Sequence, residues 1–136
     1  MIAEFDLSSP QDGNHTYAIS IQTGAWRNSG TTANVGLVLF GEESVSNPIF
    51  FAHQHLERIF FARGSVNTFT LSLEKSLGSL YKVNVWHDNS GKNPSWFLLE
   101  ITIEDLRTRE KWHFVANRWL SKQGKPQMGI SHGLLG

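Results

Sequence analysis

The stretch that decides the fold is WHDNSGKNPSWFLLEITIEDL, from Trp86 to Leu106. Its first half gathers a carboxylate, two amides, a glycine and a proline within a few positions. Aspartate and asparagine bond to their own backbone in turns, Gly91 adopts a positive φ without steric cost, and Pro94 ends a strand ladder. Its second half places apolar side chains on one face of a strand: Phe97, Leu99, Ile101 and Ile103. We therefore predict a tight turn that leads into a half-buried strand.

The same period-two alternation runs through most of the chain. It is found in HTYAISIQTG (15–24), ANVGLVLFG (33–41), NTFTLSLEK (67–75), LYKVNVWHD (80–88) and EKWHFVAN (110–117), with a short RWLS (118–121) after them. Segments rich in glycine and asparagine separate these strands. The sequence IFFA occurs twice, at 49–52 and 59–62, and we interpret both copies as core-facing clusters. Seven or eight short strands at this spacing predict an antiparallel β-sandwich.

The composition is that of one folded domain without a nucleic-acid partner. The chain has 136 residues, of which 40% are hydrophobic and 18% charged, and this length can bury one sizeable core. Its net charge is zero, whereas a nucleic-acid-binding surface needs a basic excess to neutralise phosphates. The absence of cysteine excludes disulfides and Cys-based metal sites. We expect the sandwich over residues 14–121, an N-terminal flank over 1–13 and a C-terminal flank over 122–136.

Catalytic motifs are missing from the sequence. It has no Gly-x-Ser-x-Gly elbow, no phosphate-binding glycine loop and no His-Glu-x-x-His pair, so we predict that the chain is not an enzyme. Asp88 and Asn89 are candidate metal ligands, because the rim of a sandwich can gather oxygen atoms from several loops around calcium. With one carboxylate, such a site would have a dissociation constant on the order of 10⁻⁴ M or weaker. No cofactor is required, and the alternative interpretation of both residues is a turn without an ion.

Trp26 is the tryptophan that the sequence places in a loop, between Ala25 and Arg27. Core positions are expected for the other four: Trp86, Trp96, Trp112 and Trp119. A loop tryptophan beside an arginine suits a membrane interface, with the ring in the apolar layer and the charge at the phosphates. Lys92 would lie at the same end of the fold if the two hairpin loops meet. The alternative is that Trp26 folds back over the end of the sandwich.

A second basic set lies in the C-terminal hairpin. It consists of Arg107, Arg109, Lys111, Arg118, Lys122 and Lys125, interleaved with Glu104, Asp105 and Glu110. This set is either a solvated face of mixed charge or a patch for lipid headgroups or a partner. The candidate lipid- or partner-binding residues are therefore Trp26, Arg27, Lys92, Arg107, Arg109 and Lys111.

Four blocks of the sequence together resemble the PLAT domain, also called LH2, which lipoxygenases, lipases and polycystins share. The blocks are YAISIQTGAWRNSGTTANVGLVLFG, FARGSVNTFTLSL, VWHDNSGKNPSWFLLEITIEDL and FVANRWLS. The match covers roughly residues 16–121, and within the family the blocks are most similar to the polycystin-1 group. The resemblance implies an all-β, eight-stranded antiparallel β-sandwich of the C2-like kind that is not catalytic. Calcium-binding members carry aspartates where this chain has Ala25 and Thr32, which implies a depleted calcium site.

The resemblance also implies partners and a location. In the polycystin-1 group the domain is similar to a cytoplasmic module of a multipass membrane protein. We therefore expect a regulatory domain on the cytoplasmic side of a membrane that docks to an anionic phospholipid surface, with weak modulation by calcium. Protein partners or other cytoplasmic segments of the parent channel are expected as well. The alternatives are a module that binds protein partners only, and the lipid-targeting domain of a lipoxygenase- or lipase-like enzyme.

Overall fold

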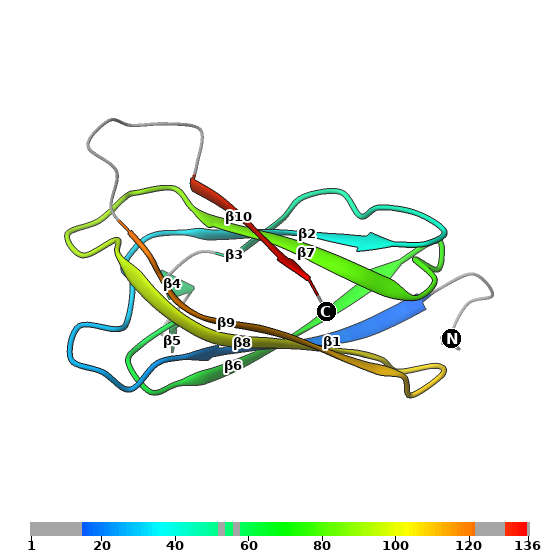
Figure 1. The fold of residues 1–136 in the computed structure, drawn as a ribbon, viewed down its shortest axis with the longest axis horizontal. Coiled ribbons are helices and arrows are strands. Elements are labelled where there is room, and N and C mark those ends of the chain that lie inside the picture. Colours follow the sequence, from blue (N-terminus) through cyan, green and yellow to red (C-terminus); the bar gives the residue numbers. More distant parts are fainter. Residues whose placement is uncertain (1–14, 52–53, 56–57, 122–129, 136) are drawn as a thin grey trace.

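Two four-stranded antiparallel sheets pack face to face in the computed structural model, which describes residues 15–51, 54–55, 58–121 and 130–135 (Figure 1). Sheet A has the order β6 (Val66–Leu73), β1 (His15–Thr23), β8 (Trp96–Asp105) and β9 (Lys111–Leu120). Sheet B has the order β10 (Ile130–Leu135), β7 (Leu80–His87), β2 (Val35–Gly41) and β3 (Ile49–Phe51). A short pair, β4 (Gln54–His55) and β5 (Arg58–Ile59), lies between β3 and β6 in the chain. The predicted antiparallel β-sandwich is confirmed, and no helix of the described part could cross a membrane.

The core lies between the sheets and follows from the alternation of the strands. Every second side chain points inward, because successive residues of a strand face opposite sides. β1 buries Tyr17, Ile19 and Ile21, and β2 buries Val35, Leu37 and Leu39. Full burial of such a side chain stabilises the fold by roughly 1.5–3 kcal/mol. The buried Tyr17 hydroxyl accepts a hydrogen bond from the Leu77 backbone N–H at 3.0 Å, so this polar group is satisfied.

Two register shifts change the faces that the sequence assigns. The first lies between Leu98 and Glu100 in β8. A β-bulge adds one residue and so reverses the in–out order on one side of it. Trp96 and Leu98 are therefore fully buried, while Leu99, predicted to face the core, is only half-buried. Phe97 is buried as predicted, at 9% exposure, but its ring packs on Trp119 and lies outside the main core cluster.

The second shift lies opposite the start of β7, between Phe40 and Gly41 of β2. Leu80 is buried there, and the predicted core residue Tyr81 is 49% exposed. The short RWLS strand predicted at 118–121 is the continuation of β9. In both places the strand lies where the sequence predicts it, and only the assignment of side chains to the inner or outer face changes.

Two segments differ more from the sequence interpretation. Residues 130–135, placed in the C-terminal flank, form β10 and pair with β7 from Ile130–His87 to Leu135–Lys82. Their alternation is short and interrupted by Gly133, so the period-two signal is weak. In the first IFFA copy, Phe50 is 71% exposed rather than core-facing. In the second copy, Phe61 is fully buried, as predicted.

Gly36 allows close packing on the outer face of sheet B. A Cβ atom added there would lie 2.4 Å from Cε2 and Cζ2 of Trp86, whose indole covers the β2 backbone. Gly36→Ala should lower the free energy of unfolding by about 1–3 kcal/mol, because the indole must move. Urea denaturation measures the change.

Gly133→Ala is the matched control in the same sheet. There the added Cβ would lie 3.1 Å from Cε of Lys82, a flexible side chain that can shift. Its effect should stay below about 1 kcal/mol. An equal loss for both variants would contradict the role assigned to the Trp86 ring.

Candidate functional site

Three loops meet at one end of the sandwich, which we call the loop end. They are the β1–β2 loop (24–34), the β5–β6 loop (60–65) and the β7–β8 loop (88–95), at the left of Figure 1. Backbone hydrogen bonds join them: Gly64 N–H donates to Gly24 O at 2.8 Å, and Thr32 N–H donates to Asn93 O at 3.0 Å. The expected meeting of the two hairpin loops is confirmed.

The Asp88 carboxylate holds the β7–β8 loop against the β1–β2 loop. Oδ1 accepts hydrogen bonds from Asn34 N–H at 3.0 Å, from Ser90 N–H at 3.1 Å and from the Ser90 hydroxyl at 2.5 Å. Oδ2 accepts from the Asn34 side-chain amide at 2.8 Å. Partial burial acts to raise the pKa of Asp88, but these bonds from Ser90 and Asn34 outweigh it and hold the pKa below 3.8.

His87 fixes the other side of the same turn. Its fully buried ring contacts the carbonyl oxygens of Leu120 and Ser121 through Nε2, at 3.1 and 3.2 Å. Nδ1 accepts from the Asn89 N–H at 3.0 Å, so the geometry fits the neutral tautomer with its proton on Nε2. Burial lowers the pKa of His87 below 6.5, against the opposing effect of the two carbonyls and of the Asp88 charge.

The Asp88 carboxylate, which the sequence predicts as a calcium ligand, is already hydrogen-bonded to protein donors. Asp88 accepts four hydrogen bonds from protein donors, and Asn89 has a positive φ of 61° that closes the turn. The Thr32 hydroxyl accepts from Asn93 N–H at 2.9 Å. No group of three potential His, Cys, Asp or Glu ligands occurs in the described part of the chain. The arrangement of Asp88 is that of a turn-stabilising side chain.

Trp26 projects from the loop end and is 66% exposed. A turn closed by Ser29 N–H on Trp26 O at 3.0 Å, with Asn28 at a φ of 65°, presents it. The alternative in which the ring folds back over the sandwich is therefore wrong. Among the remaining tryptophans, Trp96 is fully buried and Trp112 packs against the core. Two do not fit the core position expected for them: Trp119 is 42% exposed, and Trp86 lies on the outer face of sheet B.

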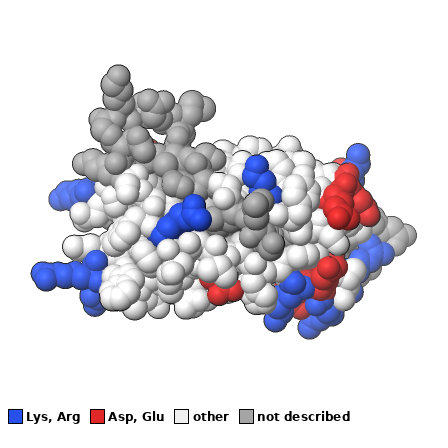
Figure 2. All heavy atoms as spheres, viewed as in Figure 1, with Lys and Arg blue, Asp and Glu red and all other residues white. Residues whose placement is uncertain are grey.

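The side chains around Trp26 are basic. Arg27 and Lys92 are exposed and belong to two of the three loops. Arg63 of the β5–β6 loop is a third exposed cation. It is not among the predicted binding residues, because only the fold brings that loop to Gly24. Figure 2 shows basic side chains without acidic ones at this end of the visible face. Among the described residues of the three loops, Asp88 is the one carboxylate.

Of the second predicted basic set, Arg107, Arg109 and Lys111 lie at the opposite end of the sandwich, in the β8–β9 hairpin (Figure 1). Arg118 lies near the other end of β9, where it pairs with Leu98, and Lys122 and Lys125 lie outside the described residues. Arg109 pairs with Glu104 at 3.3 Å, and Figure 2 shows mixed charges at that end. Arg107 and Lys111 belong to the same hairpin region. The predicted binding residues therefore do not form one surface: Trp26, Arg27 and Lys92 lie at one end and the three hairpin cations at the other.

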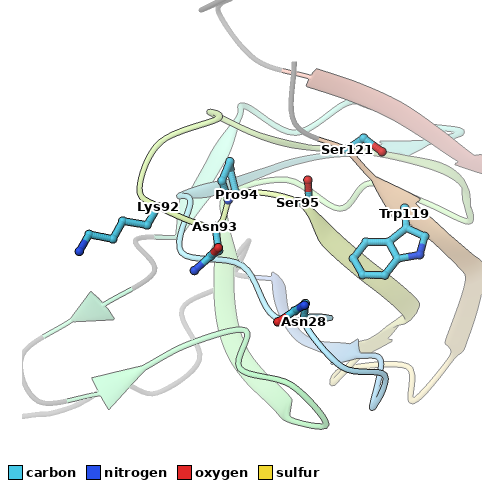
Figure 3. Close-up of a pocket in the computed structure, with 7 residues that line it drawn as sticks. All are labelled: Asn28, Lys92, Asn93, Pro94, Ser95, Trp119 and Ser121. Atoms are coloured by element: carbon cyan, nitrogen blue, oxygen red, sulfur yellow. The ribbon is translucent and has the colours of Figure 1, made fainter. Parts of the chain in front are cut away.

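An open cavity of about 550 Å³ lies beside the loop end (Figure 3). It is lined by Asn28, Lys92, Asn93, Pro94, Ser95, Trp119 and Ser121. These residues come from the β1–β2 loop, the β7–β8 loop and the end of β9. The exposed Trp119 ring packs edge-to-face on Phe97 with 5.2 Å between centroids.

Lowering the pH should destabilise the chain in two separate windows. The pKa of His87 is below 6.5 in the folded chain, so below about pH 6.5 the unfolded chain binds the proton first and stability falls. The pKa of Asp88 is below 3.8, so its contribution is present above that pH and is lost as the pH falls through the folded pKa. Thermal denaturation followed by circular dichroism over this range measures both.

His87→Gln separates the two windows. Its amide keeps a donor for the Leu120 and Ser121 carbonyls but does not titrate. The fall in melting temperature between about pH 6.5 and 5 should disappear in this variant, while the fall below pH 3.8 remains. An unchanged upper window in His87→Gln would show that another group causes it.

Known proteins with similar sequences are polycystins. The chain is 40% identical to human polycystin-1 over 121 residues. This alignment covers 88% of this chain and 3% of polycystin-1. It is 43% identical to the mouse polycystin family receptor for egg jelly over 105 residues. That alignment covers 77% of this chain and 5% of the receptor. The chain thus spans a small fraction of these relatives.

Solved structures with the same fold include lipoxygenases. A coral 8R-lipoxygenase, described as activated by calcium through a C2-like domain, matches with a TM-score of 0.72 at 19% identity. The match covers 88% of this chain and 16% of the lipoxygenase, so it shows the fold alone. The family model of the PLAT/LH2 domain matches residues 17–129. This chain belongs to the PLAT/LH2 domain family.

Proposed function

We propose that the chain is a non-catalytic regulatory domain that docks its loop end onto an anionic phospholipid membrane. The observation that carries the proposal is the 66% exposed Trp26, which projects among basic side chains from three loops. Similarity to polycystins supports a place in a membrane protein of that type, and we propose that the domain lies on the cytoplasmic side of such a multipass protein. The lipoxygenase-like alternative has less support, because the likeness to those enzymes is confined to the fold.

The chemistry of the loop end matches the boundary between headgroups and acyl chains. An indole is enriched there because its apolar ring enters the acyl layer while its N–H stays among polar groups. Arg27, Arg63 and Lys92 would then lie at the level of the lipid phosphates. Arginine can bind a phosphate through two parallel hydrogen bonds, whereas lysine acts as a point charge.

The expected affinity is low. Partial insertion of Trp26 contributes about 2 kcal/mol at about 25 cal/mol per Å², and each of three cations adds about 1 kcal/mol near an anionic leaflet. The sum of about 5 kcal/mol corresponds to a dissociation constant of roughly 0.2 mM. A domain tethered to membrane spans would stay docked at this affinity, because the tether raises its effective concentration. Weak docking can also be switched by a change of charge.

Calcium is a weak modulator at most in this proposal. Calcium-dependent docking needs free carboxylates, whereas the Asp88 carboxylate already accepts four hydrogen bonds. The cations of the loop end attract anionic lipid without a bridging ion.

A second candidate function is the binding of a protein partner on the outer face of sheet B. Phe50 is 71% exposed there and contacts Trp86 edge-on, with 6.0 Å between ring centroids. Phe40 and the exposed Tyr81 form another aromatic pair on this face, at 6.4 Å. Exposed aromatic side chains are typical of protein interfaces. Other cytoplasmic segments of the parent protein are the proposed partners.

Trp26→Ala should weaken binding to phosphatidylserine-containing vesicles about thirtyfold, because it removes about 2 kcal/mol of inserted apolar surface. Arg27→Ala should weaken it about fivefold. Sedimentation of the chain with vesicles, in the presence and absence of millimolar calcium, measures both effects. Binding to pure phosphatidylcholine should be much weaker.

Lys111→Ala is the matched control, since it removes a cation from the opposite end and should leave vesicle binding unchanged. Equal losses for Arg27→Ala and Lys111→Ala would mean that binding follows net charge rather than the loop end. Binding that appears only with calcium would refute the proposal that the cations replace the ion.

Phe50→Ser should abolish capture of a purified cytoplasmic segment of the parent protein and leave vesicle binding intact. The serine removes exposed apolar surface on the outer face of sheet B and leaves Trp26, Arg27 and Lys92 unchanged. Pull-down and vesicle sedimentation with the same preparation separate the two functions. Retained capture by the folded variant would refute the partner site on this face.

A further inference from the structure

The cavity beside the loop end has rigid walls (Figure 3). The Pro94 carbonyl accepts from the Thr31 hydroxyl at 2.6 Å. The Asn93 backbone is bonded to Thr32 through both its N–H and its carbonyl group. The Ser121 carbonyl contacts Nε2 of His87 at 3.2 Å. A site held in this way loses little conformational freedom when a ligand binds.

The amide groups of the lining are available to a ligand. Neither Asn28 nor Asn93 makes a side-chain hydrogen bond to another residue that the structure describes. Each amide carries two donors and one acceptor oxygen. Such a group matches a hydroxyl, which both donates and accepts.

The interior of the cavity is uncharged. No carboxylate lines it, and in Figure 3 the Lys92 side chain extends away from the other lining residues. A phosphate bound inside would therefore have no cation directed at it. The chemistry favours a neutral ligand that is rich in hydroxyl groups.

Trp119 supplies an apolar wall on one side, and Lys92, Asn93 and Pro94 stand on the other (Figure 3). An aromatic ring can cover an apolar face of a ligand whose edge carries hydroxyl groups. A hexose ring has this construction, with C–H groups on its face and hydroxyls around its rim. The volume of about 550 Å³ lies within the range of roughly 300–1,000 Å³ that is usual for small-molecule sites.

We propose that this cavity binds a neutral hexose ring. The C–H face of the sugar packs on the Trp119 indole, and its hydroxyls bond to the amides of Asn28 and Asn93. The ring can belong to a glycolipid headgroup or to a free hexoside. Only the glycolipid case rests on the proposed membrane docking, since a free sugar needs no membrane.

The test is saturation-transfer NMR of the 136-residue chain with the methyl glycosides of glucose, galactose and mannose. At least one glycoside should receive saturation at its ring protons. Trp119→Ala should weaken that binding about tenfold, and Trp119→Phe should restore part of it. Trp26→Ala should bind the glycoside like the unmodified chain. Circular dichroism confirms that each variant is folded.

The inference is overturned if none of the three glycosides receives saturation, or if folded Trp119→Ala binds as well as the unmodified chain. Its failure is distinct from that of membrane docking, which the vesicle assay with Trp26→Ala measures separately. Sedimentation with neutral vesicles that contain or lack glucosylceramide shows whether the bound hexose belongs to a lipid headgroup or to a free hexoside. Retention only with glucosylceramide indicates a lipid headgroup, and binding of the free glycoside without such retention indicates a soluble ligand.

Discussion

The set of hydrogen bonds accepted by the Asp88 carboxylate is the interaction on which the loop end depends. It joins Asn34, at the start of β2, to Ser90 in the turn after β7. Without it, the β1–β2 and β7–β8 loops would keep the backbone link through Thr32 and Asn93 but lose their charged connection. Buried or half-buried carboxylates with several donors are strong acceptors. The Asp88 bonds act together with the Thr32–Asn93 and Thr31–Pro94 contacts to hold the two loops side by side.

The hydrogen bonds of Asp88 bear on the comparison with solved structures of the same fold. The coral lipoxygenase is described as activated by calcium through a C2-like domain, and its fold matches closely. In the present chain Thr32 and Asp88 bond to neighbouring loop residues instead. Fold similarity alone therefore does not decide whether a chain responds to calcium.

The sequence predicts the strands well because period-two alternation is a direct consequence of one-sided burial. It predicts the phase poorly where β-bulges occur, as at Leu98, because a bulge is set by the pairing of two strands. β10 escapes prediction because Gly133 interrupts a short pattern. The exposure of Trp26 is predictable from the sequence, because its neighbours in the loop are small or polar. Arg63 and Trp119 are not, since tertiary packing alone brings the β5–β6 loop and the end of β9 to the site.

The distance between the basic loop end and the mixed-charge β8–β9 hairpin has an electrostatic consequence. β8 links them with ten residues, which at about 3.3 Å per residue span roughly 33 Å. The screening length at physiological ionic strength is about 8 Å, so the two ends lie about four screening lengths apart. A charge added to the Arg107–Lys111 hairpin is thus electrically insulated from whatever the loop end contacts. The molecule can carry two independent charge signals, one at each end of the sandwich.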